Sequence, residues 1–210
     1  MSELRGLFAN TYIYIYTYIS AIVVTSACPM RHYSNYSAFL NSFYTSRVDE
    51  HGAIKFDVVF GPAYKGISLG AVVCAALYND FGIDTGFAYN RKEAKDHGEG
   101  GILVGSTMTN KRVLIVDDVI TAGTAIRESY DLLKSIGATP VGVVIALDRA
   151  ERRSLDDPLS AVQAVARDMD IPVVSIVALP QLQEYLRLSP NNYGEDVLKL
   201  VVEYRSKYGV

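Results

Sequence analysis

From residue 53 onward, short unbroken apolar runs alternate with longer stretches in which apolar residues recur at helical spacing. The runs are typical of strands buried on both faces of a sheet, and the longer stretches of amphipathic helices. We predict strands at 54–60, 85–89, 102–104, 113–116, 141–147 and 173–179. We predict helices at 67–78, 126–136, 161–169, 182–188 and 197–204. This alternation predicts an α/β fold with a central, mostly parallel sheet flanked by helices.

The most informative stretch of the chain is residues 113–125. An apolar run at 113–116 leads into two carboxylates, Asp117 and Asp118, and a turn of small residues precedes the next helix. Small residues at a helix N-terminus leave backbone amides accessible, and the positive end of the helix dipole favours a phosphate there. Carboxylates just upstream suit sugar hydroxyls or Mg²⁺, which prefers oxygen ligands. Such short motifs also occur for packing alone, so this stretch by itself leaves both interpretations open.

A second strand–loop–helix unit spans residues 54–78. Its loop, residues 61–66, begins and ends with glycine and displays Tyr64 and Lys65. Glycine and proline indicate a tight turn, and ligands of open α/β sheets bind beyond the carboxyl ends of the strands. This position favours a binding role for Lys65 over that of an ordinary solvated lysine.

Residues 90–101 are dense in charge, end in glycines and contain no apolar residue larger than alanine. Such a segment cannot bury a face, so we predict an exposed, flexible loop. It is either simply solvated or a lid that closes cations over a polyanionic leaving group. Its candidate cations are Arg91, Lys92, Lys95 and His97.

Composition narrows the class of protein. The chain has 210 residues, half of them hydrophobic, and a net charge of −3, which argues against a nucleic-acid binder that works through a basic surface. Its two cysteines, Cys28 and Cys74, show no metal-ligand spacing. We expect them to be free thiols in a reducing, cytoplasmic setting.

The N-terminal residues 1–52 differ in texture from the rest, and residues 11–24 are a low-complexity run rich in tyrosine and isoleucine. A secretory signal, a membrane span and a β-strand are alternatives, although the run is shorter than the ~20 residues that a span requires. Its codons could also derive from a dinucleotide repeat, which would indicate a misassigned start or exon boundary. We therefore expect a divergent N-terminal segment at 1–52 and one domain at 53–210.

Four stretches together resemble the orotate phosphoribosyltransferases, which are type I phosphoribosyltransferases. They are residues 60–66, 87–101, 117–125 and 147–149. The wording Asn-Arg-Lys-Glu-Ala-Lys-Asp-His-Gly-Glu-Gly is the most specific of them, and the resemblance runs from about residue 54 to the C-terminus. It implies the type I phosphoribosyltransferase fold with a flexible catalytic loop.

The resemblance also implies a reaction. Phosphoribosyl pyrophosphate (PRPP) and orotate would give orotidine 5′-monophosphate and pyrophosphate, with Mg²⁺, in de novo pyrimidine (UMP) biosynthesis. PRPP would be bound by Tyr64, Lys65, Arg91, Lys92, Lys95, His97, Asp117, Asp118, Val119, Ile120, Thr121, Ala122, Gly123, Thr124 and Ala125. Orotate would contact Thr121 and Arg149, the latter through the orotate carboxylate. The catalytic residues would be Lys95, His97, Arg91, Asp117 and Asp118, with Glu99 in support and Lys95 the most rate-critical.

The resemblance implies further properties of the assembly. Mg²⁺ would be held mainly by substrate, with no certain protein ligand. The protein would be a homodimer in which loop 91–101 reaches the neighbouring active site. Neither a nucleic acid nor a membrane is an expected partner.

The chain departs from the family in the N-terminal hood, where the family carries Lys-Ser-Gly-Arg-x-Ser-Pro-Tyr-Phe. Residues 31–36 are aromatic and basic but differ in wording and spacing, so the hood is altered or incomplete. A second interpretation therefore stays open: a relative that binds PRPP as a sensor or partner subunit but is impaired in catalysis. Another kind of nucleotide-binding domain is less favoured, because neither a Gly-x-Gly-x-x-Gly after a strand nor a Gly-Lys-Ser/Thr loop is present.

Overall fold

The computed structural model describes residues 56–95, 101–152, 158–188 and 195–210. Contacts divide the chain into two units, residues 1–54 and 55–210, and all described residues belong to the second. The predictions for residues 1–52, including the altered hood, lie outside the described residues. The side chain of Lys95 and residues His97 and Glu99 lie outside them as well.

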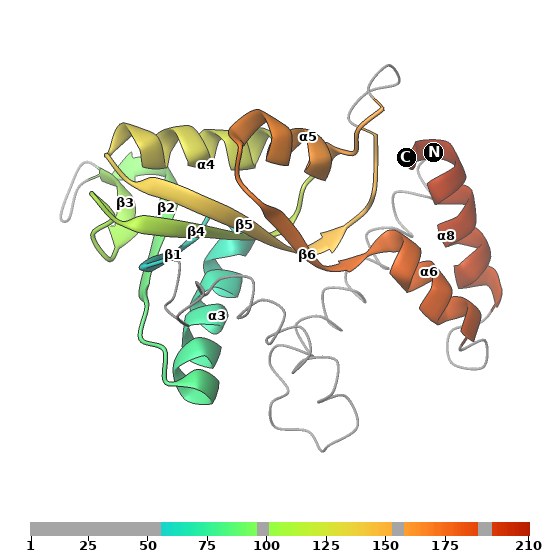
Figure 1. Ribbon diagram of the computed structural model, residues 1–210, viewed down its shortest axis with the longest axis horizontal. Helices are drawn as coiled ribbons and strands as arrows, with labels where there is room; N and C mark the ends of the chain where they lie inside the picture. Colours follow the sequence, from blue (N-terminus) through green and yellow to red (C-terminus); the bar gives the residue numbers. More distant parts are fainter. Residues whose placement is uncertain (1–55, 96–100, 153–157, 189–194) are drawn as a thin grey trace. The chain divides into compact units, whose positions relative to one another are not determined.

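Within the described residues, six strands form one sheet in the order β3-β2-β1-β4-β5-β6 (Figure 1). The strands are β1 Val58–Gly61, β2 Gly86–Lys95, β3 Gly101–Gly105, β4 Arg112–Val119, β5 Thr139–Asp148 and β6 Val173–Ala178. All neighbouring pairs are parallel except β2 and β3, which are antiparallel. The predicted mostly parallel sheet is therefore confirmed.

Helices cover both faces of the sheet. They are α3 Lys65–Phe81, α4 Thr124–Ser135, α5 Ala161–Met169, α6 Leu179–Leu188 and α8 Glu195–Tyr208. Helix α3 packs on β1, β2 and β4, whereas α4 and α5 lie on the opposite face and contact β5 and β6 respectively (Figure 1). Helices α6 and α8 pack on each other through Leu186 and Val201. None of the helices described combines the length and the apolar composition needed to cross a membrane.

The core lies where the apolar runs of three neighbouring strands meet. Phe60 of β1, Ile115 of β4 and Ile145 of β5 are all fully buried, and Phe60 and Ile115 are direct partners in the β1–β4 register. Strands with helices on both faces must be apolar on both faces, which explains why these runs do not alternate with polar residues. The central strands are thereby held firmly enough to position the loops that follow them.

Several strand and helix bounds differ from prediction by a few residues, and two of the differences involve charged residues. The predicted loop 90–101 is wrong for residues 90–95, which extend β2 and pair with β3, as Asn90 with Leu103 and Lys95 with Gly101. Beyond Tyr89, β2 has β3 as its neighbour but no longer pairs with β1, and strands near the edge of a sheet can carry charged side chains. Hydrogen bonding to β3, rather than burial of a face, therefore makes this segment a strand.

The second boundary lies at the acidic pair. Strand β4 does not end at Val116 but continues to Val119, because pairing with β5 continues as Asp117 with Ile145 and Val119 with Leu147. Asp117 and Asp118 are therefore strand residues rather than residues of the following loop. Both are 9% exposed, so the sheet buries two carboxylates at its carboxyl edge.

Candidate active site

The sheet topology places two loops side by side. The chain proceeds from β1 to β2 in one direction and from β4 to β5 in the other, so the order reverses between the neighbours β1 and β4. Open α/β sheets bind ligands beyond the carboxyl ends of the strands at such a point. The loop after β1 leads into Lys65, and β4 ends with the acidic pair.

Lys65 and Asp118 meet at this point. The Nζ atom of Lys65 donates to Oδ2 of Asp118 at 2.6 Å, although 53 positions separate the two residues. The side chain of Lys65 is 49% exposed and that of Asp118 is 13% exposed. The cation therefore reaches from solvent to an enclosed carboxylate and connects the two loops that sequence analysis selected separately.

The two aspartates share an enclosed environment. The Oδ1 atom of Asp117 accepts a hydrogen bond from the backbone N–H of Asp118 at 2.9 Å. Burial, together with the negative charge of Asp118, raises the pKa of Asp117 to about 7, and Lys65 opposes this rise. Two carboxylates whose charges repel at one strand end suit acceptance of hydrogen bonds from hydroxyl groups or contact with a cation.

The turn after β4 forms an open helix N-terminus. Ile120 is buried, whereas Thr121, Ala122, Thr124 and Ala125 are exposed, and Val119 before them is half-buried. Helix α4 begins after Gly123, which provides no side-chain cap, and the first turn contains no acidic residue. Backbone amides and a positive helix end are therefore accessible, which is the arrangement that binds phosphate.

Gly123 is required in this turn for two reasons. Its φ is +80°, in the left-handed region, and a Cβ there would lie 2.5 Å from Cγ2 of Val165 and 2.6 Å from Nη1 of Arg127. A larger residue would have to push α5 or Arg127 away from the turn. The small-residue pattern of the sequence thus reflects close packing behind the turn as well as access in front of it.

Arg127, which was not predicted as a site residue, holds the same turn in place. Its Nη1 donates to the carbonyl oxygen of Ala122 at 2.8 Å, and its Nη2 donates to Oδ2 of Asp168 on α5 at 2.8 Å. Arg167 also bonds Asp168 and, with Arg127, holds the pKa of that carboxyl below its usual value. The helical spacing of Arg127 relative to Gly123 could have indicated this role, but only the structure shows which carbonyl is held.

The loop after β1 is held to β2. The backbone N–H of Ala63 donates to Oδ1 of Asn90 at 3.0 Å, and Nζ of Lys92 lies 4.9 Å from the centre of the Tyr64 ring, over its face. Tyr64 is 68% exposed. The structure therefore brings the predicted residues Tyr64, Lys65 and Lys92 to one edge with the acidic pair, and adds Asn90, which sequence analysis did not single out.

Other predicted residues are placed less completely. Arg91 is half-buried in β2, and the backbone of Lys95 ends that strand. Arg149 follows β5, and its Nη2 lies 3.0 Å from Oε2 of Glu151. Because β5 neighbours β4, Arg149 is carried at the same edge of the sheet as the acidic pair, one strand further along.

The residues described include no group of three or more His, Cys, Asp or Glu placed to hold a metal ion. Asp117 and Asp118 offer two carboxylates, and Mg²⁺ is commonly bound through one or two carboxylates together with substrate phosphates and water. The donor set therefore fits a magnesium ion that arrives with a phosphorylated substrate, and does not form a closed cage.

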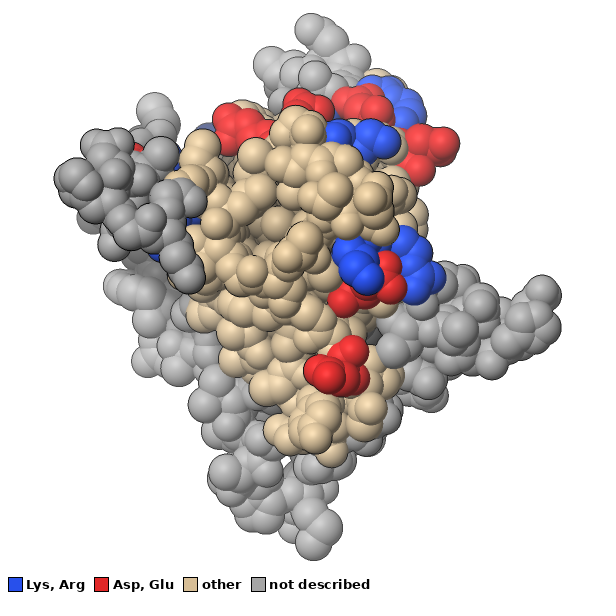
Figure 2. All heavy atoms as spheres, turned by 90° about the vertical axis from the view of Figure 1, so that its left-hand side faces the viewer, with Lys and Arg blue, Asp and Glu red and all other residues tan. Residues whose placement is uncertain are grey.

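Figure 2 shows one face of the described molecule. Most of its visible basic side chains lie beside acidic ones among uncharged surface, and no broad basic patch is seen on this face. One such pair in the structure is Arg112 with Asp57, whose pKa is lowered to about 2 by its hydrogen bond to that arginine.

Known proteins match this chain over most of its length. The family model for the phosphoribosyl transferase domain matches residues 33–175. A protein from Thiobacillus denitrificans, named orotate phosphoribosyltransferase, is 54% identical over 171 residues, covering 81% of this chain and 77% of its own. A protein of the same name from Stutzerimonas stutzeri is 52% identical over 178 residues, covering 82% and 79%.

A solved structure shares the fold. The crystal structure of orotate phosphoribosyltransferase from Francisella tularensis superposes with a TM-score of 0.65 at 37% identity, covering 84% of this chain and 79% of that one. The sheet order, the two loops at its switch point and these similarities agree. The chain belongs to the orotate phosphoribosyltransferase family and has the type I phosphoribosyltransferase fold.

Proposed function

We propose that this protein transfers the phosphoribosyl group of PRPP to orotate, which yields orotidine 5′-monophosphate and pyrophosphate in pyrimidine biosynthesis. The observation that carries the proposal is the meeting of Lys65, the acidic pair and the open N-terminus of α4 at one edge of the sheet. The chain that forms this site is about half identical to proteins named for that reaction.

The geometry supports a division of roles around PRPP. The turn from Val119 to Ala125 offers backbone amides to the 5′-phosphate, and Asp117 and Asp118 accept hydrogen bonds from the ribose hydroxyls. We assign the pyrophosphate to Tyr64, Lys65 and Lys92, and to Arg91, Lys95 and His97 of the charged segment 90–101. These positions place the sugar between its two charged ends.

The orotate half of the site lies further along the sheet. Thr121 is exposed in the phosphate turn, and Arg149 follows the next strand. A guanidinium can fork onto a carboxylate with two parallel hydrogen bonds. We assign the carboxylate of orotate to Arg149 and a second contact of the base to Thr121.

The transition state resembles a ribosyl oxocarbenium ion as the bond from the anomeric carbon to pyrophosphate breaks and the bond to orotate nitrogen forms. Negative charge grows on pyrophosphate, so cations beside it, Lys95 above all, stabilise the transition state. Orotate is already an anion and needs little base catalysis. Closure of the charged segment 90–101 over the site would exclude water, which would otherwise hydrolyse the sugar phosphate.

We propose Mg²⁺ as the cofactor, bound together with PRPP and within reach of Asp117 and Asp118. When bound, the ion supplies positive charge that neutralises the phosphate oxygens. The raised pKa of Asp117 supports a cation here, because a nearby cation relieves the repulsion between the two carboxylates.

We further propose a homodimer in which residues 91–101 reach the neighbouring active site, and a cytoplasmic location. The family resemblance supports the homodimer. Cys74 is a free, partly enclosed thiol, and burial raises its pKa, which suits a reducing compartment.

The test is the ultraviolet absorbance of orotate in the presence of PRPP, Mg²⁺ and the protein. We expect an absorbance change that requires all three and is accompanied by release of pyrophosphate. Asp118→Asn should abolish most of the change, whereas Asp131→Asn, an exposed position on α4, should not.

The alternative, a PRPP-binding relative impaired in catalysis, is favoured only by the altered wording of residues 31–36. No absorbance change at high protein concentration, together with PRPP binding by calorimetry, would support that alternative. If neither turnover nor PRPP binding is observed, both interpretations are wrong.

A further inference from the structure

The ion pair between Arg149 and Glu151 is unusually enclosed for this molecule. The two side chains are 20% and 14% exposed, whereas those of Arg112 and Asp57 are 47% and 33% exposed. An enclosed pair loses more hydration than an exposed one, so it must be compensated by good hydrogen bonds or retained for another reason.

Hydrogen bonds do not supply that compensation. The Nε and Nη2 atoms of Arg149 and Oε1 of Glu151 are buried and have no hydrogen-bond partner among the residues described. Nε and Nη2 form one edge of the guanidinium, so this edge is enclosed beside Glu151. Burial raises the pKa of Glu151, and Arg149 opposes this rise.

The backbone that carries the pair is fixed from several sides. The N–H of Ala150 donates to Oδ1 of Asp148 at 2.8 Å, and φ of Ala150 is +51°. The carbonyl oxygen of Glu151 accepts from the N–H of Ala161 at 2.9 Å, and Glu151 forms a bridge with Gly209. The turn is therefore held against both α5 and the segment after α8.

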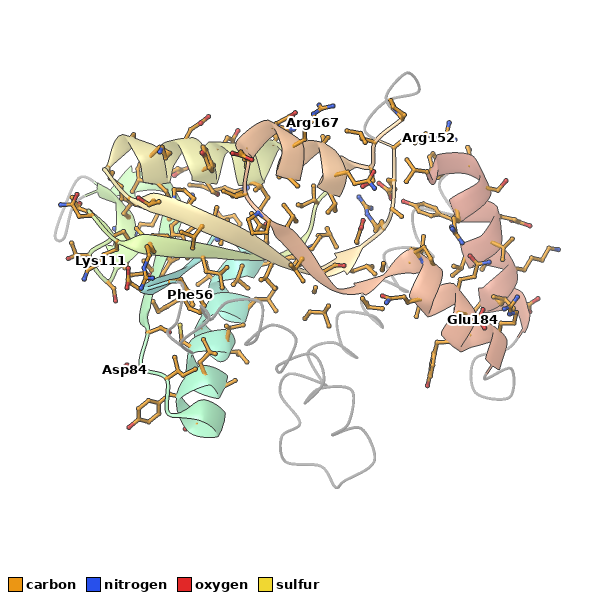
Figure 3. The ribbon with its side chains drawn as sticks, in the orientation of Figure 1. Phe56, Asp84, Lys111, Arg152, Arg167 and Glu184 are labelled. Carbon is orange, nitrogen blue, oxygen red and sulfur yellow. The ribbon has the colours of Figure 1, made fainter. Side chains whose placement is uncertain are left out.

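Arg152 reinforces this attachment. Its backbone N–H donates to the carbonyl oxygen of Tyr208, and its Nε donates to that of Gly209, both at 2.9 Å. Figure 3 shows Arg152 beside the C-terminal end of α8. A side chain presented from such a constrained turn has little freedom to leave its neighbour, which suits positioning of another group.

We propose that Glu151 is a positioning residue for orotate: its carboxylate, 3.0 Å from Nη2 of Arg149, holds the guanidinium in place for the substrate carboxylate. The inference rests on the proposed function, because it assigns that carboxylate to Arg149. Holding the arginine in advance reduces the side-chain entropy that orotate binding would otherwise have to overcome. Incomplete hydrogen bonding within the pair leaves Arg149 able to bind a second carboxylate.

The charged neighbours of Glu151 determine the sign of its pH dependence. Arg149 is the cation beside it, and Asp148 is the nearby acid. On α8, Arg205 bonds Gln183 and Lys207 lies over the Tyr208 ring; on the α5 side, Ser160 and Gln163 bond each other. Protonation of Glu151 would remove its attraction for Arg149, so orotate should bind less tightly as pH falls through the pKa of Glu151.

The experiment compares Glu151→Gln with wild type across pH in steady-state assays. The glutamine keeps the shape of the side chain but removes its charge. At pH values above the pKa of Glu151, we expect KM for orotate to be about tenfold higher in the variant than in wild type. KM for PRPP should stay within about twofold of the wild-type value. In wild type the KM for orotate should rise at low pH, and in the variant this pH dependence should be absent. Glu151→Asp, which keeps the charge, should restore part of the affinity.

Glu184→Gln, which breaks an exposed ion pair with Arg187 on α6, is the matched control and should change neither KM. A lower KM for orotate in Glu151→Gln would mean that Glu151 competes with orotate for Arg149, and an unchanged KM would mean no role; either result overturns the proposal. If wild type shows no turnover, the proposed function is wrong, whatever the role of Glu151. The orotate affinities of Glu151→Gln and wild type are then compared by calorimetry. Loss of orotate binding in both proteins would overturn the positioning role as well.

Discussion

Lys65 and Asp118 join the first residue of α3 to the end of β4 through a contact of 2.6 Å between Nζ and Oδ2. Each partner also has a role in substrate binding under the proposed function, the lysine with pyrophosphate and the aspartate with a ribose hydroxyl. PRPP must therefore separate this pair, with the lysine bound to its pyrophosphate and the aspartate to its ribose. The contact keeps both groups close to their working positions before substrate arrives.

Replacement of Lys65 by glutamine tests this arrangement. We expect KM for PRPP to rise about tenfold, because a charge-assisted contact to pyrophosphate is lost, while KM for orotate changes little. The pKa of Asp117 should also rise, since Lys65 lowers it. Steady-state kinetics across pH would measure both effects. Lys111→Gln is the control, because Lys111 is exposed and precedes β4 at the amino ends of the strands. An equal effect there would contradict a local role for Lys65.

Asp117 should make stability depend on pH. Its pKa is raised from 3.8 to about 7, so between these values the folded state binds a proton that the unfolded state does not. Stability contributed by this group is therefore present at low pH and lost as pH rises towards 7. Asp117→Asn removes this loss, so the variant should gain stability relative to wild type between pH 5 and 8.

Each unit of pKa shift corresponds to about 1.4 kcal/mol of unfolding free energy. The gain for Asp117→Asn should be smaller than the value for the whole pKa shift, because Asp117 and Asp118 titrate together. Urea denaturation at pH 5 and pH 8 would measure it. Activity should fall at pH 8, where wild type has a charged carboxylate to accept from a ribose hydroxyl and the variant has only a neutral amide. An identical stability difference at the two pH values would show that Asp117 does not carry the raised pKa.

Arg127 should contribute to PRPP affinity without touching substrate. Arg127→Met keeps the aliphatic stem but loses the hydrogen bond to the carbonyl of Ala122, so the phosphate turn should loosen. We expect KM for PRPP to rise about tenfold with turnover less affected, since a buried or charged hydrogen bond is typically worth this much. Asp168→Asn should give a smaller effect in the same direction. Arg187→Met on α6 is the control. An unchanged KM for PRPP in Arg127→Met would contradict a role for Arg127 in holding the turn.

Local signals explain what the sequence predicted well. The predicted helix 161–169 coincides with α5, and it begins after Ser160, whose side chain and that of Gln163 form a capping box. The apolar runs of β4 and β5 were identified because strands covered on both faces carry little else. In each case the signal lies within a few residues of the element that it predicts.

The differences arise where distant residues decide the structure. Strand β4 extends through two aspartates partly because Lys65, far away in the chain, offsets their burial. Strand β2 extends through charged residues because β3 pairs with it. The acidic pair and the phosphate turn were predicted from their motif, but the contacts of Arg127 and Glu151 depend on α5 and on the segment after α8, which the sequence alone does not place.

Lys95→Ala tests the catalytic role proposed for Lys95 in the charged segment 90–101. Because a lid cation acts on charge that develops only in the transition state, we expect turnover to fall by about 100-fold or more with each KM changed only a few-fold. Lys92→Ala is the comparison, since Lys92 lies over the Tyr64 ring and should affect mainly KM for PRPP. Equal losses in turnover and affinity in Lys95→Ala would contradict transition-state stabilisation.

Gly123→Ala and Gly82→Ala separate backbone strain from packing. Both glycines have positive φ, +80° and +66°, so alanine should cost about 1 kcal/mol of stability at either position. Nothing lies within 4 Å of a Cβ at Gly82, whereas a Cβ at Gly123 would meet Val165 and Arg127.

Arg127 could move aside only by giving up the carbonyl of Ala122. We therefore expect Gly82→Ala to lose stability with unchanged kinetics, and Gly123→Ala to raise KM for PRPP at least about tenfold as well. Chemical denaturation and steady-state kinetics would measure the two effects separately. If Gly123→Ala lost only stability, the close packing of Arg127 behind the turn would have no part in binding phosphate.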